Sequence, residues 1–97
     1  MNKISAIIPT LNRPKDLRDA VASILRQKHL PNELIIIDQS LDDQSYNAVN
    51  GLYEEFDVAP KLVYLHEPEV GGLIEAKQRG VQIAKGDIIS FLDRKST

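Results

Sequence analysis

The sequence predicts an α/β protein with a doubly wound, mostly parallel sheet, in which strands and helices alternate as β-α-β-α-β-α-β. First, short apolar runs of strand length alternate with longer segments whose apolar residues recur at helical spacing. Second, the connections between these segments are short. Third, the central runs are apolar almost throughout, which is typical of strands that helices cover on both faces. Right-handed crossovers then favour a single doubly wound sheet.

The strands are predicted by apolar runs that end at turn residues. The first run, rich in isoleucine, stops at Pro9, and the second ends in Asp38 after three consecutive isoleucines. Runs of this kind indicate buried strands. The predicted strands cover residues 3–8, 33–38, 61–65 and 87–92.

The first helix is predicted from its start signals. Asn12 is a good N-cap, Pro14 lies near the first helical position and Asp16 falls in the first turn. Pro31 is expected to end this helix. The residues with helical spacing are Leu17, Ala20, Val21, Ile24 and Leu25.

Two further helices follow the second and third strands. Asp42 or Asp43 is expected to cap the second helix, and Gly51 weakens it slightly. The third helix has small residues on one face, and Gly86 is its expected C-terminal stop. The apolar stripe of the second helix is Val49, Leu52, Tyr53 and Phe56, and the third presents Leu73, Ala76, Gly80 and Ala84.

Composition limits the classes of function. Ninety-seven residues form one domain, expected at 1–93 with a polar end at 94–97. The net charge of −2 and the 5% aromatic content give no basis for binding nucleic acid. Without cysteine there is no disulfide or thiolate metal site. The N-terminus lacks a signal-peptide pattern and no apolar stretch is long enough to span a membrane, so we expect the cytoplasm.

Ligands of open parallel sheets bind beyond the carboxyl ends of the strands, which selects residues 9–13, 38–43, 66–72 and the segment from Asp93 onward. The turn from Pro9 through Thr10 to Asn12 presents polar groups to a ligand or simply begins a helix. The partner of Asp38, whose carboxylate would be costly to bury alone, is an internal N–H or a ligand donor.

Other polar residues of these segments have plainer interpretations. Gly71 and Gly72 let a phosphate approach the backbone or form a flexible turn. Lys77 and Arg79 are two residues apart, so on a helix they point to different faces. Asp42 and Asp43 are expected in a solvated turn, and His29 and His66 are expected to be structural or solvated. The sequence lacks the glycine-rich motifs of dinucleotide oxidoreductases and P-loop enzymes and the G-x-S-x-G motif of α/β-hydrolases.

Three segments together resemble family-2 glycosyltransferases, which have the GT-A fold with a Rossmann-like nucleotide-binding half. The segments are ISAIIPTLNRPKDLRDAVASIL, ELIIIDQSLDD and GGLIEAKQRGVQIAKGDIISFLD. The resemblance covers residues 4–93 in the right order and spacing. It implies a domain that binds a nucleoside-diphosphate sugar, of the UDP or dTDP type, for transfer of the sugar to an acceptor hydroxyl.

The resemblance also implies roles for individual residues. Pro9 and Thr10, with Asn12 in the same turn, would line the nucleotide pocket, and Asp38 would accept a hydrogen bond from the uracil or thymine ring. The stretch that begins with Gly71 and Gly72 would lie near the diphosphate. Its basic residue is Lys77, and its other matching positions are Ala76, Gln78 and Gly80.

The sequence departs from the family at the metal motif. The fourth strand should lead into Asp-x-Asp, which holds Mn²⁺ or Mg²⁺ against the diphosphate. Asp93 is present, but Lys95 takes the second position, and a lysine supplies no oxygen ligand to a hard cation. Gln39 replaces a second acidic residue after Asp38.

We assign no catalytic residue, because in this family the acceptor-binding half and the catalytic base follow the region matched here. We therefore expect a truncated domain that is inactive alone and binds the ion weakly.

Two other classes of protein remain as alternatives. A phosphate-receiver domain needs an acidic cluster after the first strand, where this chain has Pro9 and Thr10, so that class is disfavoured. A structural or interaction fragment without a ligand is the main alternative, and nucleotide titration separates it from the transferase.

The family strand order, 3-2-1-4, would leave strand 87–92 at an edge and predicts a homodimer through it. Alternatively, Arg94 and Lys95 keep that edge soluble.

Overall fold

A computed structural model describes residues 3–69 and 71–92, in which seven elements alternate between strand and helix. Their order is β1 (Ile4–Thr10), α1 (Pro14–Leu25), β2 (Glu33–Asp38), α2 (Gln44–Glu54), β3 (Lys61–His66), α3 (Leu73–Ile83) and β4 (Ile88–Phe91). The strands form one parallel sheet in the order β3-β2-β1-β4. The predicted fold class is therefore confirmed, with every strand pair parallel.

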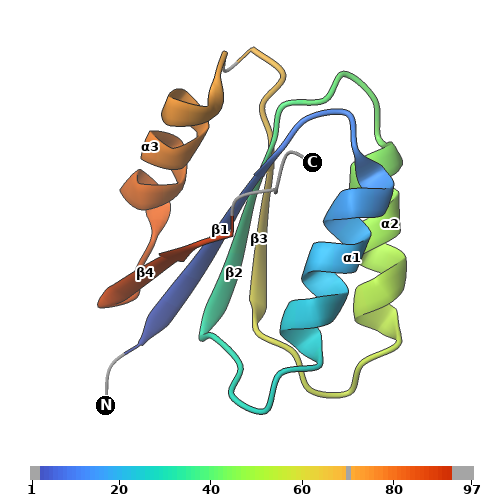
Figure 1. Cartoon of the computed structure of the whole chain (residues 1–97), viewed down its shortest axis with the longest axis vertical. Helices are drawn as coiled ribbons and strands as arrows, with labels where there is room; N and C mark the ends of the chain where they lie inside the picture. The colour runs from blue at the N-terminus through green and yellow to red at the C-terminus, as the bar shows by residue number, and fades with distance from the viewer. Residues whose placement is uncertain (1–2, 70, 93–97) are drawn as a thin grey trace.

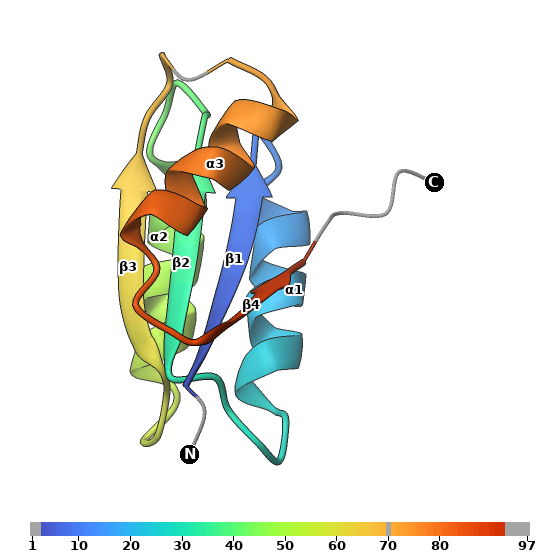
Figure 2. The same ribbon diagram turned by 90° about the vertical axis from the view of Figure 1, so that its left-hand side faces the viewer.

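The sheet lies between two helical layers, with α1 and α2 on one face and α3 on the other (Figures 1 and 2). Alternate residues of the central strands serve the two cores. Ile8 and Ile36 belong to the cluster beneath α1 and α2, whereas Ile7, Ile35 and Ile37 pack with Ala76 of α3. All six residues of β2 are buried, and only the first residue of β1 is exposed.

The prediction that the first strand stops at Pro9 is wrong, because β1 continues to Thr10. Hydrogen-bonding direction alternates along a parallel strand. The carbonyl of Ile7 faces β4, where it accepts from Leu92 N–H, and that of Thr10 faces β2, where it accepts from Gln39 N–H. The backbone groups of Pro9 face the β4 side, as those of Ile7 do, and the described pairing with β4 ends at Phe91, opposite Ile7. Because the nitrogen of Pro9 faces away from β2, its missing N–H costs no hydrogen bond to β2.

The predicted limits of α1 also need correction. Arg13 is the N-cap, and Asn12, with a φ of 53°, is in the left-handed region rather than at the cap. At the other end the helix stops at Leu25, well before Pro31. Leu25 is the last buried residue of the helix, and the next four residues are exposed, so no core contact extends it.

Two predicted helix signals act differently in the structure. Asp43 occupies the N-cap of α2 without a side-chain bond, while Asp42 Oδ1 accepts from Gln44 N–H at 3.1 Å. Gly86 does not cap α3, whose C-cap is Ala84 in extended conformation. A Cβ on Gly86 would lie 2.8 Å from the carbonyl oxygen of Lys3, so glycine is needed there for close approach to β1.

A buried polar network closes the amino end of the sheet. Ser5 Oγ donates to Glu33 Oε2 at 2.6 Å, and Lys85 N–H donates to the same oxygen at 2.7 Å. Gly86 N–H in turn donates to Ser5 Oγ at 2.8 Å. Burial acts to raise the pKa of Glu33, but these bonds and the charges of Lys61 and Lys85 outweigh it and hold the pKa below its usual value. The ionised carboxylate therefore ties the turn before β4 to both central strands.

We expect Glu33→Gln to destabilise the fold by about 1–2 kcal/mol at neutral pH, because a neutral amide makes weaker hydrogen bonds at a buried position. A lowered folded-state pKa stabilises the fold above the ordinary carboxyl pKa, and this stabilisation is lost as the pH falls through the folded-state value. The difference between wild type and Glu33→Gln should therefore shrink in acid. Urea unfolding across this pH range measures it, with exposed Glu54→Gln as control. A difference that stays constant in acid would contradict the charged network.

Candidate functional site

The carboxyl ends of β1, β2 and β3 meet at one edge of the sheet, the upper edge in Figure 1. Backbone hydrogen bonds join the loops there: Gln39 N–H donates to Thr10 O at 2.9 Å, and Glu67 N–H donates to Asp38 O at 2.7 Å. The direction of winding reverses between β1 and β4, since β2 and β3 extend the sheet on one side of β1 and β4 on the other. Such a reversal is where ligands bind in open α/β sheets.

Thr10 is the last residue of β1 and stands at this reversal. It is 5% exposed, and its hydroxyl is buried without a hydrogen-bond partner among the described residues. Buried hydroxyls are normally paired, because an unpaired one loses its bonds to water without replacement. The Thr10 hydroxyl is thus a donor and acceptor that the described part of the chain leaves unused.

Asn12 contributes its backbone to the same edge. Its N–H donates to Ser40 Oγ at 2.6 Å, while its side chain is exposed. The Ser40 carbonyl is 2.6 Å from Nε2 of His66. Asn12 adopts positive φ at this connection, a conformation that asparagine tolerates. His66, expected to be structural or solvated, joins the loops after β2 and β3 through this contact.

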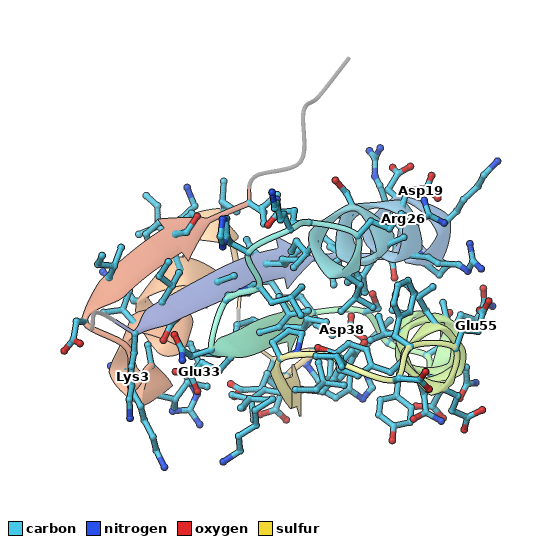
Figure 3. All side chains as sticks on the ribbon, turned by 90° about the horizontal axis from the view of Figure 1, so that it is seen from below. Lys3, Asp19, Arg26, Glu33, Asp38 and Glu55 are labelled. Carbon is cyan, nitrogen blue, oxygen red and sulfur yellow. The ribbon has the colours of Figure 1, made fainter. Side chains whose placement is uncertain are left out.

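The partner of Asp38, left open by the sequence, is internal. Asp38 is fully buried; its Oδ1 accepts from Ser40 N–H at 2.9 Å and its Oδ2 from the Tyr64 hydroxyl. Burial, together with the hydrogen bond to Asp38 and nearby negative charge, raises the pKa of Tyr64. The phenol therefore stays neutral and remains a donor to the carboxylate. In Figure 3, Asp38 and Glu33 mark the two ends of β2.

The glycine pair opens α3. Gly72 is the N-cap with a φ of 84°, a conformation that side-chain-bearing residues rarely adopt. Its carbonyl accepts from the Gln39 side-chain amide at 2.9 Å, which ties this turn to the end of β2. Gly71 is exposed, and a Cβ added there would have no neighbour within 4 Å. The structure requires glycine at position 72, but the described residues impose no such steric demand at position 71.

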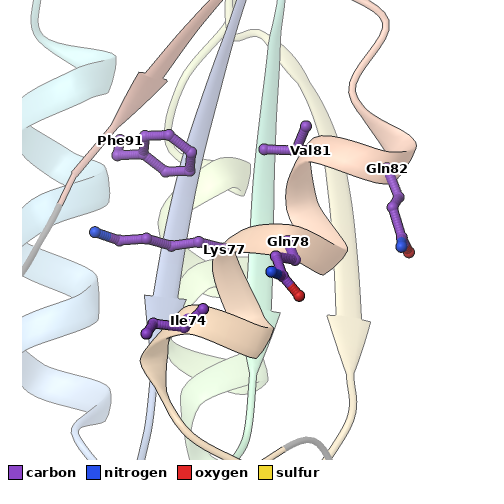
Figure 4. A pocket seen from close by; sticks show the side chains of 6 residues that line it. All are labelled: Ile74, Lys77, Gln78, Val81, Gln82 and Phe91. Atoms are coloured by element: carbon purple, nitrogen blue, oxygen red, sulfur yellow. The ribbon is translucent and has the colours of Figure 1, made fainter.

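Lys77 and Arg79 point in different directions, as their spacing predicts. Arg79 Nε donates to Glu67 Oε1 at 2.8 Å and so reaches the loop after β3. Lys77 Nζ lies 5.3 Å from the ring centroid of Phe91 on β4 (Figure 4). Lys77 and Phe91 border a cavity of about 430 Å³ between α3 and β4. Lys77 therefore lies on the β4 side of the edge.

The predicted metal ligand Asp93 lies outside the described residues. Within residues 3–69 and 71–92 there is no group of three acidic, histidine or cysteine side chains able to hold an ion. Over the same ranges, no helix is long and apolar enough to cross a membrane.

The structure thus joins Thr10, Asn12, Asp38 and Gly72 at one edge. Two residues that the sequence reasoning missed, Ser40 and Tyr64, supply donors to Asp38. The Asp-x-Ser pattern was a usable signal for Ser40, because aspartate commonly accepts from the N–H two residues later. Tyr64 carried no such signal, since it reaches Asp38 only through strand pairing.

We expect Tyr64→Phe to lower the free energy of unfolding by about 1–3 kcal/mol, because it removes one donor from a buried carboxylate. Tyr46→Phe is the matched control, since Tyr46 packs edge-on against Tyr64 with ring centroids 5.1 Å apart but is 44% exposed. Chemical denaturation of both variants measures the difference. Equal stabilities would show that the hydroxyl of Tyr64 contributes nothing to the fold.

Comparisons with known proteins identify the family of the chain. The chain matches the family model described as Glycosyl transferase family 2 over residues 5–94. It is 32% identical over 94 residues to the GalNAc(5)-diNAcBac-PP-undecaprenol beta-1,3-glucosyltransferase of Campylobacter jejuni, covering 96% of this chain and 29% of that protein. It is 30% identical over 90 residues to the glycosyltransferase GlyG of Streptococcus pneumoniae, covering 93% and 29%.

The fold is shared with glucosyl-3-phosphoglycerate synthase from Mycobacterium tuberculosis, solved in complex with Mn²⁺, uridine diphosphate and glucosyl-3-phosphoglycerate. The TM-score is 0.70 at 28% identity, over 95% of this chain and 33% of that one. The chain spans about a quarter to a third of the length of such curated relatives. With a family match over nearly the whole chain and a sheet of the same architecture, the protein belongs to glycosyltransferase family 2.

Proposed function

We propose that this chain binds the nucleoside diphosphate part of a nucleotide sugar, of the UDP or dTDP type, at the carboxyl edge of its sheet. In the family context, this binding would present the sugar for transfer to an acceptor hydroxyl. The mycobacterial synthase supports the choice of nucleotide, because it shares the fold and was solved with uridine diphosphate.

The observation that carries the proposal is the buried, unpartnered hydroxyl of Thr10 at the reversal of the sheet. A protein that maintains an unpaired buried hydroxyl loses stability for it. A ligand that forms a hydrogen bond with this hydroxyl would supply the missing partner, so the lost stability would be regained in the bound state. A nucleotide has suitable donors and acceptors on its base and its ribose.

The diphosphate would lie against the turn that opens α3. The N-terminus of a helix presents unpaired N–H groups and a partial positive charge, which favour anions. The exposed Gly71 leaves room for a phosphate to approach the backbone. Lys77, on the β4 side of the same edge, would add a full positive charge.

Asp38 would accept the N–H of the pyrimidine ring. Each carboxylate oxygen has two lone pairs, so the bonds from Ser40 and Tyr64 leave acceptor capacity. Asp38 has no exposed surface, however, and the Thr10 hydroxyl is also buried, so the nucleotide reaches both groups only if the loops above them open. The free energy of opening subtracts from the affinity. We therefore propose weak binding, no tighter than high micromolar.

We further propose that these 97 residues catalyse no transfer by themselves. Transfer needs a group that deprotonates the acceptor and a positive charge that stabilises the leaving diphosphate. We assign no base to any residue of the chain. Lys95 occupies the position where the family motif has a second metal-binding aspartate.

We expect Thr10→Val to weaken UDP binding about fivefold to tenfold, which corresponds to about 1–1.4 kcal/mol, while leaving the free energy of unfolding equal or higher. Valine keeps the shape of threonine and removes only the unpaired hydroxyl. Thr10→Ser is the control that retains the hydroxyl. NMR titration of the three proteins with UDP measures affinity, and shifts at Thr10 and Asp38 locate the site. Unchanged UDP affinity of Thr10→Val, or shifts that avoid both residues, would refute the proposed site.

Adding Mn²⁺ or Mg²⁺ should change the affinity for UDP by less than about threefold, and no sugar transfer or donor hydrolysis should be detected, because one aspartate beside a lysine is a poor ion site. Lys95→Asp restores the Asp-x-Asp spacing and should introduce metal dependence. Calorimetric titration with and without the ion compares the two proteins. A gain of about tenfold, or 1.4 kcal/mol, in the unmodified chain would show that other oxygen atoms complete the ion site.

A further inference from the structure

Gln39 connects two of the loops that form the candidate site to the start of α3. It directly follows the last residue of β2, and its backbone N–H donates to the carbonyl of Thr10, at the end of β1, at 2.9 Å. Its side-chain amide donates to the carbonyl of Gly72, the N-cap of α3, also at 2.9 Å. Gln39 is 8% exposed. One buried residue therefore holds the end of β1 and the start of α3 at the same time.

Asp38 and Gln39 serve opposite faces of the sheet, because successive side chains of a strand alternate between its faces. Ile36 belongs to the core beneath α1 and α2, whereas Ile35 and Ile37 belong to the core beneath α3. Asp38 continues the first series, and Gln39 continues the second and reaches the start of α3. The carboxylate proposed to accept from the base ring and the turn proposed to meet the diphosphate therefore lie on different faces, and the side chain of Gln39 links them.

Close packing holds the body of α3 to the sheet, beginning one turn after its N-cap. Ala76 and Gly80 are buried, and a Cβ on Gly80 would lie 2.6 Å from Cγ2 of Ile7. The N-cap residue, Gly72, has no side chain to pack, and glycine has the freest backbone of all residues. Its carbonyl accepts from Ala76 N–H at 3.3 Å and from the amide of Gln39 at the shorter distance of 2.9 Å. Gln39 therefore fixes the turn that precedes the packed part of the helix.

The orientation of the Gly72 carbonyl governs the N–H groups of the first turn of α3. In an α-helix the carbonyls point toward the C-terminus and the N–H groups toward the N-terminus, where the first of them lack partners within the helix. A carbonyl that is fixed at the N-cap therefore also fixes the direction of these N–H groups. The amide of glutamine can donate to a carbonyl, whereas a carboxylate or an apolar side chain cannot. The chemical identity of residue 39 thus determines whether this turn is fixed.

We propose that Gln39 is a positioning residue for the diphosphate, an inference that rests on the nucleotide binding proposed above. It does not touch the ligand. Its amide holds the turn at Gly72 so that the N–H groups of the first turn of α3 face the phosphates while the base reaches Thr10 and Asp38. A site that is ordered before binding loses less free energy to ordering when the ligand arrives. The contribution of the Gln39 side chain is therefore confined to the phosphate part of the nucleotide.

NMR titration of wild type and Gln39→Met with UDP and with uridine tests the proposal. Methionine keeps the length and the unbranched shape of glutamine and removes the amide donor. We expect the affinity for UDP to fall about threefold to tenfold, the effect of losing an ordered turn, and the affinity for uridine to stay unchanged. Gln27→Met, at an exposed position after α1, is the matched control and should change neither affinity. A residue with a merely structural role would lower both affinities by the same factor.

Amide hydrogen exchange tests the fixing of the turn without nucleotide. In Gln39→Met the amide of Ala76, which donates to the Gly72 carbonyl, should exchange faster than in wild type. The amide of Ala84, which donates to Gly80 O at the other end of α3, should be unchanged and serves as the internal control.

Three outcomes would overturn the proposal. Unchanged exchange at Ala76 would show that Gln39 does not fix the turn. An unchanged ratio of UDP to uridine affinity in Gln39→Met would refute the role of Gln39 alone and leave the nucleotide site standing. A wild-type chain that binds neither UDP nor uridine would refute the nucleotide site, and the role of Gln39 with it.

Discussion

The burial of β1 and β2 on both faces is the constraint on which the rest of the structure depends. Helices cover both sides of these strands, so their interior positions hold only side chains that tolerate a dry environment. Polar residues are confined to the strand ends, where partners from neighbouring segments can reach them. Ser5 and Glu33 lie at one end of the strand pair, and Thr10 and Asp38 lie at the other.

The two ends satisfy their polar groups to different degrees. At the amino end, Glu33 and Ser5 bond to each other and to the backbone before β4, so the network is closed. At the carboxyl end, Asp38 is bonded by Ser40 and Tyr64, but the hydroxyl of Thr10 has no partner within the described residues. The closed network stabilises the fold, whereas the unpaired hydroxyl is the group on which the proposed binding of a nucleotide depends. This difference separates the structural end of the sheet from the candidate site.

The sheet is also uneven from side to side. β1 and β2 are buried, but β4 is exposed along its length and bordered by hollows on both faces. Lys77, on the β4 side of the candidate site, lies over the ring of Phe91. Any chain that covers β4 would therefore change the surroundings of Lys77.

The sequence by itself determined the class of fold, because hydrophobic period is a local property. Isoleucine-rich runs alternate with helical spacing, and the strand Glu33–Asp38 has the predicted limits. The predicted strand order was confirmed, and the residues proposed for the site after the first three strands lie at the expected edge, because parallel strands place all their carboxyl ends together.

Tertiary structure decided what depends on partners distant in sequence. Asn12 lies before the cap in left-handed conformation, with its N–H bonded to Ser40, and Gly86 closely approaches β1 instead of ending a helix. Pro9 remains within a strand because its nitrogen faces the β4 side of β1, where the described pairing has already ended at Ile7. The second internal donor to Asp38 is the hydroxyl of Tyr64, 26 residues away. The local hydrophobic pattern indicates which face of a helix or strand is apolar, whereas the packing of the whole chain determines the partner of each polar group.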